Sequence, residues 1–404
     1  MLLKRTKPYL IILILMALAV SPAFALGEGN RNLLLIGAMG LMPIIILYFG
    51  RFDRINPWLG VFMLSVIIIP LIHQPQSMRW STVLYSVMFC LTFMAYQELL
   101  HRSYFTPKHY LKLLKYLILA YFVVLVIQQF CVLTGLPVFN LSNYNPTEPW
   151  KLNALAAEPS HSARIVGLLM YCYITIKELV INRKYNFKID IKKDKWVWIA
   201  FIWTMVTMVS GTAFLFIVIV LLKFIRFKNL IPVFILAGTI FILVNYFEIT
   251  SFERTYKTVI ATLTLDESTI IEADHSASVR IVPFIILGKM ISLNSWDGWF
   301  GHGIDHVGTF LSDALLGVPE GISGGGMFQV WIEYGFISFV LFVVFSLFTT
   351  YRKGDYISIV FWFMLVFLYG VNSQIVWLCI ILLFTNKYFF KRTSIKNKLQ
   401  NGNS

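Results

Sequence analysis

The sequence predicts an all-α polytopic membrane protein, a single integral membrane domain over residues 1–404, and three observations lead to this class. Hydrophobic residues make up 58% of the chain and charged residues only 13%, whereas soluble domains carry about 45–50% and roughly 25%. The mean hydropathy is +0.73. Apolar runs long enough for membrane helices recur along the chain. Too few charges remain to cover a water-facing surface, which excludes a soluble globular, disordered or collagen-like protein.

About 12 apolar runs are candidate transmembrane helices, and an even number places both termini on one side of the membrane. With cytoplasmic termini, 26 of the 34 Lys and Arg fall in cytoplasmic segments, and 14 of the 20 Asp and Glu fall in external ones. Basic residues accumulate in cytoplasmic loops, so this division predicts that orientation. The expected spans are 8–26, 32–50, 57–73, 80–97, 111–134, 164–180, 196–211, 212–225, 229–246, 328–350, 356–371 and 373–390.

The N-terminal run has two interpretations. Basic residues precede it, and Ala23-Phe24-Ala25 at its end fits an Ala-x-Ala signal-peptide cleavage site. The alternative is an uncleaved first helix, which we favour because a second apolar span follows within a few residues.

The net charge of +14 does not by itself indicate nucleic-acid binding. Two basic clusters, at 183–195 and 387–398, fall on the side predicted to be cytoplasmic, where anionic lipid headgroups attract Lys and Arg. No nucleic-acid-binding motif accompanies them. We therefore expect no nucleic-acid partner.

Two external loops are long in a chain whose other connections are short, and long loops commonly carry function. The first covers residues 135–163 and the second covers residues 248–326. Within the second, residues 276–292 are too short to span and have charges at both ends, which predicts a helix on the membrane surface or packed over the bundle. The polar chemistry of the external side is concentrated in these loops.

The first candidate site is the segment Glu-Pro-Ser-His-Ser-Ala-Arg at 158–164. If the turn after Pro159 is helical, Glu158 and His161 are three residues apart and share a face, as do His161 and Arg164. A carboxylate can take a proton from a hydroxyl while an arginine holds a phosphate. The alternative is a capping Glu158 beside an Arg164 that reaches toward the interface.

Two further candidates could bind an anion. Ser210, Gly211 and Thr212 lie between two short spans, where a turn of small residues can expose backbone N–H groups at a helix N-terminus. Arg280 lies on the expected surface helix, and its guanidinium fork matches two phosphate oxygens. A plain hairpin turn and an ion pair with a nearby acid are the respective alternatives.

The fourth candidate is His302, which lies between Gly301 and Gly303, so that backbone or ligand can approach its ring closely. With Asp305 and His306 it could bind zinc, but that spacing needs a helix and Gly303 argues against one. A positioning or acid–base role is favoured. We predict no metal and no cofactor, and P-loop, Rossmann and nucleophile-elbow motifs are absent from the sequence.

Four segments together resemble a known family. EPSH before an apolar helix, SGT before another, SVRIV followed by GWFGHGI, and FQVWIEYGFISFVLF resemble, in order and placement over roughly 135–350, the Wzy-type O-antigen and exopolysaccharide repeat-unit polymerases of the O-antigen ligase/polymerase superfamily. Ligases of this superfamily usually carry a His-Asn pair before the last segment. Here Gly324-Gly325-Gly326-Met327 stands in that place, so the resemblance favours a polymerase.

The resemblance implies an inverting, metal-independent glycosyltransferase of the bacterial inner membrane, with a large, partly helical periplasmic loop. It would transfer a glycan from undecaprenyl diphosphate to a hydroxyl of another lipid-linked unit, with a chain-length regulator as a possible further partner. Arg164 and Arg280 would stabilise the departing diphosphate, and Glu158, supported by His161, would be the base, with His302 as the alternative. An O-antigen ligase remains the alternative enzyme, and a lipid-linked oligosaccharide flippase is the alternative from another class.

Overall fold

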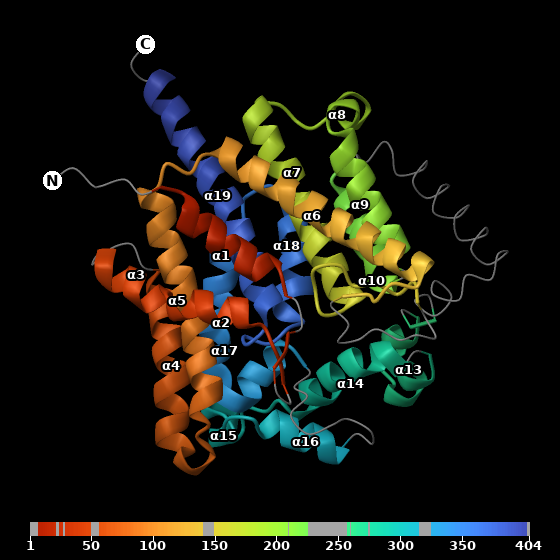
Figure 1. Cartoon of the computed structure of the whole chain (residues 1–404). Helices are drawn as coiled ribbons and strands as arrows, with labels where there is room; N and C mark the ends of the chain where they lie inside the picture. Colours follow the sequence, from red (N-terminus) through yellow and green to blue (C-terminus); the bar gives the residue numbers. More distant parts are fainter. Residues whose placement is uncertain are drawn as a thin grey trace.

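The computed structural model describes the chain except residues 1–6, 22–23, 27–28, 50–55, 140–148, 209, 225–256, 259, 274, 315–324 and 402–404. The described part is a bundle of α-helices with one short antiparallel hairpin (Figure 1). Its N-terminal half contains α1 Tyr9–Ala19, β1 Phe24–Leu26, β2 Gly29–Arg31, α2 Leu33–Gly40, α3 Met42–Phe49, α4 Pro57–His73, the 3₁₀ turn η1 Pro75–Ser77, α5 Trp80–Arg102, α6 Pro107–Thr134 and α7 Pro159–Ile181.

The second half continues the bundle and adds a group of shorter helices. Its elements are α8 Phe187–Lys193, α9 Lys195–Thr207, α10 Gly211–Leu222, α13 Glu267–Ala273, α14 His275–Met290, α15 Trp296–Phe300, α16 His306–Ala314, α17 Met327–Thr350, α18 Tyr356–Trp362, the π-helix η3 Phe363–Phe367 and α19 Gln374–Asn401.

The prediction of an all-α fold with apolar helices long enough to cross a membrane is confirmed at a coarse level. Within the described residues, α5, α6, α17 and α19 are long and apolar enough to cross a membrane. Shorter apolar helices occupy parts of most other expected spans. The expected span 229–246 lies outside the described residues.

Two expected spans are wrong in extent. The helix expected over 8–26 ends at Ala19, and the β1–β2 hairpin follows. Pro22 accounts for this, because the residue before a proline disfavours helical backbone and helices end at or before it. The span expected over 32–50 is two helices that meet at Leu41, just before Pro43, which cannot donate a helical hydrogen bond.

Local signals start several of the long helices. The side chain of Asn56 caps α4 by accepting a hydrogen bond from the backbone N–H of Trp58. Thr106 caps α6 in the same way through the N–H of His109, at 3.2 Å. Each cap is followed by proline, which suits the first helical position because its missing N–H would have no helical partner there.

Helix α19 forms hydrogen bonds with the C-terminal end of α1. The side-chain amide of Gln374, at the start of α19, donates to the backbone carbonyls of Ala17, Leu18 and Val20 at 3.1, 2.7 and 3.2 Å. Its oxygen accepts from Asn32 at 3.2 Å. These carbonyls belong to the end of α1, where a helix leaves acceptors unsatisfied, so α19 completes α1.

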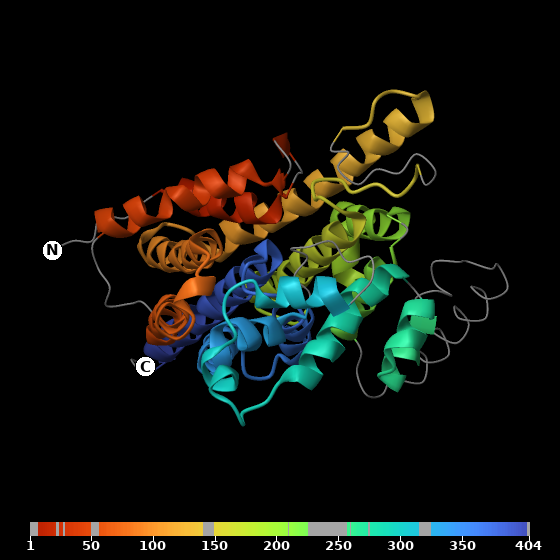
Figure 2. The same cartoon turned by 90° about the horizontal axis from the view of Figure 1, so that it is seen from below.

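Helices α7 and α10 run in the same direction, so both begin at the same end of the bundle. On α7, Gly167 faces Phe216 of α10, and Thr175 accepts a hydrogen bond from Lys223 just after α10, so the two helices run parallel. The α14–α16 segment lies at the bottom of Figure 1. Figure 2 shows it crossing the end of the bundle beside α17. We call this end of the bundle, together with the α14–α16 segment that crosses it, the loop end.

Candidate functional site

A break in α17 is the centre of the loop end. Gly335 has φ +83° and ψ 166°, which is not helical. The backbone of Trp299 and Phe300 lies so close to it that a Cβ on Gly335 would come within 2.2 Å of the Trp299 oxygen. Only glycine fits such a position, both for its conformation and for its contact.

The turn that follows α15 is seated on this break. Gly301 has φ +89°, and a Cβ there would lie 2.4 Å from the Glu333 carbonyl oxygen. The backbone N–H of His302 donates to the carbonyl of Ile332 at 2.7 Å. Gly303, with φ +104°, faces Ser77 of η1 in the same close manner. The sequence segments GHG and EYG, separated by about 30 residues, therefore form one compact unit.

Ionisable side chains surround this unit. His73 at the end of α4 contacts Asp297 at 2.8 Å. Arg79 pairs with Asp305 at 2.7 Å.

Two histidines of the expected site stack on each other. The rings of His302 and His306 lie 4.8 Å apart. Partial burial lowers the pKa of His306, and the neighbouring His302 lowers it further. The neutral form of His306 is therefore favoured near neutral pH.

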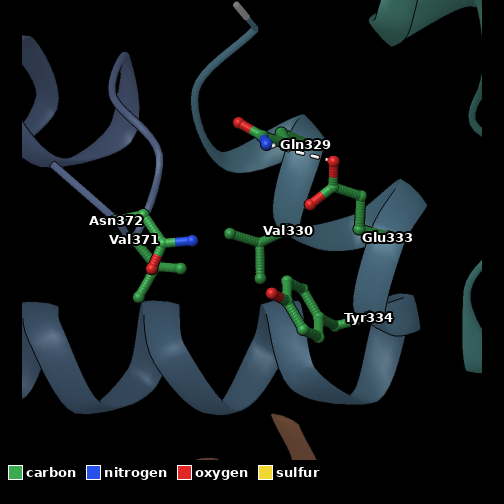
Figure 3. Close-up of a pocket in the computed structure, with 6 residues that line it drawn as sticks. All are labelled: Gln329, Val330, Glu333, Tyr334, Val371 and Asn372. Atoms are coloured by element: carbon green, nitrogen blue, oxygen red, sulfur yellow. Dashed lines mark hydrogen bonds between the residues drawn. The ribbon is translucent and has the colours of Figure 1, made fainter. Parts of the chain in front are cut away.

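A small polar cavity opens beside the break in α17 (Figure 3). Gln329, Val330, Glu333 and Tyr334 of α17 line it on one side, and Val371 and Asn372 of the turn before α19 line it on the other. Its volume of about 10 Å³ is close to what one water molecule needs. Glu333 is 1% exposed. The segment thus places a buried carboxyl group next to the GHG turn.

The first candidate segment lies at the start of α7. Glu158 is the residue before the helix, and its carboxylate accepts a hydrogen bond from Ser160 at 3.1 Å. His161 lies in the first turn. Arg164 follows one turn later, 4% exposed, with its guanidinium 4.8 Å from the centre of the Tyr369 ring. Arg164 therefore stacks on an aromatic face in an apolar setting.

The turn from Leu368 to Ser373 contacts both Arg164 and the cavity beside Glu333. Tyr369 carries Arg164 on its ring, and Asn372 lines the cavity beside Glu333. Ser86 of α5 donates to the Asn372 side-chain oxygen at 2.5 Å, which fixes the amide. Arg164 and Glu333 thus lie on either side of one short turn.

The two remaining candidates are the turn at residues 210–212 and Arg280, and they belong to different helices. Ser210 precedes α10, and Gly211 and Thr212 begin it. Because α10 runs parallel to α7, these residues lie level with the first turns of α7. The backbone of Arg280 lies in α14, but its side chain is not among the described parts. Phe284 of α14 stacks on Phe328 of α17 at 4.4 Å, so α14 packs over the start of that helix.

The cavity residues are not among the candidate site residues expected from the sequence. Glu333 belonged to the resemblance only as one residue of the segment FQVWIEYGFISFVLF. An acid inside an expected apolar span is itself a signal of function, because burying a carboxylate in hydrocarbon is costly. Tyr334 and Asn372 had no comparable signal. Within the described residues, no three His, Cys, Asp or Glu side chains form a group that could hold a metal ion.

Comparison of the chain with protein-family models, with curated proteins and with solved structures finds no match in any of the three. The functional conclusion therefore depends on the residues and their geometry.

Proposed function

We propose that the chain polymerises undecaprenyl-diphosphate-linked oligosaccharide repeat units into O-antigen or exopolysaccharide. The observation that carries the proposal is the seating of the GHG turn on the break in α17. It joins two of the four segments that carry the family resemblance, at the end of an apolar bundle where Arg164 also lies. The reacting groups of both substrates would sit at the membrane interface, which suits a site at the end of a bundle rather than at its middle.

The chemistry needs charge stabilisation more than covalent catalysis. The acceptor hydroxyl oxygen forms a bond to the anomeric carbon of the donor, and the bond from that carbon to the diphosphate oxygen breaks. The diphosphate leaves with the electron pair, and Arg164 and Arg280 are proposed to stabilise its charge. The backbone N–H groups at Ser210, Gly211 and Thr212 are a further proposed contact for phosphate oxygens.

The acceptor must also lose a proton. Glu158, with His161 in support, and His302 are the candidates from the sequence. The Gly301 and Gly303 backbone would let the substrate approach the His302 ring closely. In this proposal the loop end faces the periplasm, both termini are cytoplasmic, and the chain lies in the inner membrane of a bacterium.

Deletion of the gene, followed by gel analysis of surface glycans, tests the function. We expect glycans limited to a single repeat unit, with full length restored by the wild-type gene. Long glycans that are not attached to their lipid acceptor would indicate a ligase instead. Lipid-linked units retained in the cytoplasm would indicate a flippase, and unchanged surface glycans would refute all three.

Arg280 offers a sharper test of the same proposal. Arg280→Lys keeps the charge but loses the two-pronged geometry, so we expect both Arg280→Ala and Arg280→Lys to shorten the glycan at normal protein levels. Lys289→Ala is the matched control, because Lys289 is an exposed cation of the same helix, paired with Glu267. Full-length glycan from Arg280→Ala, or equal loss from Lys289→Ala, would remove Arg280 from the site.

A further inference from the structure

The cavity beside the break in α17 has the size and the lining of a binding site for one water molecule. Glu333 and Tyr334 are each 1% exposed. One carboxylate oxygen of Glu333 accepts from Gln329 at 3.1 Å. Among the described residues, its other oxygen and the Tyr334 hydroxyl make no hydrogen bond of good geometry, although the Val307 backbone N–H lies near the Glu333 carboxylate and the Ser86 and Asn372 side chains lie near the Tyr334 hydroxyl. Buried polar atoms are rarely left unpaired, because each loses its interactions with water.

The polar groups point into the same space. Figure 3 shows the second oxygen of Glu333, the hydroxyl of Tyr334 and the amide nitrogen of Asn372 directed toward the cavity. Asn372 keeps that orientation because its oxygen accepts from Ser86. A buried water typically makes about three hydrogen bonds, and this space, about 10 Å³, offers that number of partners.

We propose that Glu333 accepts the proton of the sugar hydroxyl during transfer, through one water molecule held in this cavity by Glu333, Tyr334 and Asn372. This inference rests on the proposed function. The acceptor O–H bond breaks as its oxygen bonds to the anomeric carbon. Its proton passes to the bound water, which gives one of its own protons to the free oxygen of Glu333. The diphosphate departs with the electron pair of the broken bond.

The position of Glu333 supports its proposed role as the proton acceptor. The backbone of Glu333 touches the GHG turn at Gly301, and the Ile332 carbonyl holds the backbone of His302. The Gln329 amide and the bound water would provide donors for a carboxylate that must be charged before it can accept a proton, and the Tyr334 hydroxyl would help to hold that water. The other ionisable side chains of the elements packed against this point are His73, Arg79, Asp297, His302, Asp305 and His306.

The test uses the purified full-length chain in lipid nanodiscs, with the single-unit lipid-linked oligosaccharide that the deletion strain accumulates. We expect Glu333→Gln to lower the initial rate of elongation by about 10²- to 10⁴-fold, the usual contribution of a proton acceptor. Glu333→Asp keeps a carboxylate, and we expect it to retain at least about tenfold more activity than Glu333→Gln. Ser338→Ala is the control, because it removes another fully buried hydroxyl of α17 and should keep the wild-type rate.

A purely structural role predicts the reverse order. Gln has the shape of Glu and keeps a partner for Gln329, so it would be tolerated, whereas the shorter Asp would be the worse replacement. Glu333→Gln at or above the Glu333→Asp rate therefore overturns the inference. If Glu333→Gln does not accumulate, Tyr334→Phe decides: it removes only the hydroxyl, and we expect about a tenfold loss. A wild-type rate for Tyr334→Phe would overturn the inference.

Failure of the proposed function gives a different result. In that case the wild-type chain does not elongate the lipid-linked substrate, and the deletion strain keeps full-length surface glycan. If the wild-type chain elongates normally and Glu333→Gln matches it, the function stands and only the role of Glu333 is wrong.

Discussion

Gly335→Ala is the substitution that most directly tests how the loop end is built. The added Cβ would lie 2.2 Å from the Trp299 oxygen and 2.6 Å from the Phe300 Cα. Both are backbone atoms, so no side chain can rotate away. Either the turn at 299–301 separates from α17 or α17 changes its path at the break.

The loss of folding free energy in Gly335→Ala has two parts. The backbone of Gly335, at φ +83° and ψ 166°, lies in a region that only glycine occupies readily, and an alanine there costs about 1–3 kcal/mol. Forcing extra atoms into a packed site adds typically 1–3 kcal/mol. We therefore expect destabilisation of about 2–6 kcal/mol.

Two alanine variants separate these parts. Gly354 has φ +82° but no atom within 4 Å of an added Cβ, so Gly354→Ala carries the conformational cost without the clash. Gly60 lies inside α4 with open space around it, and Gly60→Ala should be neutral or slightly stabilising.

Thermal unfolding in detergent micelles, followed by tryptophan fluorescence, gives the ranking. We expect the midpoint to be highest for Gly60→Ala and wild type, lower for Gly354→Ala and lowest for Gly335→Ala. Equal midpoints for Gly335→Ala and Gly354→Ala would mean that the 299–301 turn does not press on the break, and the described arrangement of the site would be wrong.

Two further predictions concern other parts of the molecule. Tyr369→Leu should weaken the seat of Arg164 by about 1–2 kcal/mol and shorten the glycan, whereas Tyr369→Phe keeps the ring and should behave as wild type in the same gel assay; equal effects would exclude a cation–π contact. The Arg183 guanidinium lowers the pKa of Asp190, so the charged carboxylate stabilises the fold above its unfolded pKa of about 3.9 and loses this effect as pH falls through the lower folded value. Wild type should therefore unfold at a higher temperature than Asp190→Asn at pH 7, and this difference should shrink as pH falls below the unfolded pKa of about 3.9. A difference that stays constant down to about pH 2 would contradict the pairing.

The sequence was most informative where structure depends on neighbours along the chain. Apolar runs marked most of the described helices. Asn56 and Thr106 before prolines begin two of them, but the expected spans do not use these caps, and the second helix, expected from residue 111, begins at Pro107. The ends of the first two spans were misjudged because Pro22 and Pro43 were given too little weight against hydrophobicity. Both prolines lie in the sequence and could have corrected the prediction.

The site was harder to predict because its form comes from contacts between distant segments. The sequence around Gly335 does not by itself indicate a break, because a glycine is also tolerated inside an unbroken helix and the residues after it are apolar. The break becomes intelligible only with the Trp299–Gly301 backbone against it. Likewise, the position of Asn372 is explained by its hydrogen bond with Ser86, which is distant in the sequence, and by the cavity that it lines. No sequence pattern indicates either contact. The roles of Glu158, His161, Arg164, Arg280 and His302 stay predictions.

The hold of Gln374 on the end of α1 has a consequence for the order of synthesis. Gln374 follows Val20 by 354 residues, so at 5–20 residues per second the first helix waits roughly 20–70 s for its partner. During that time the carbonyls of Ala17 and Leu18 need substitute donors, which interfacial water, lipid headgroups or the insertion machinery can provide, whereas the Val20 carbonyl can already accept from the Asn32 side chain. Helix α1 thus reaches its final environment long after it is made, and this part of the bundle closes only when α19 arrives.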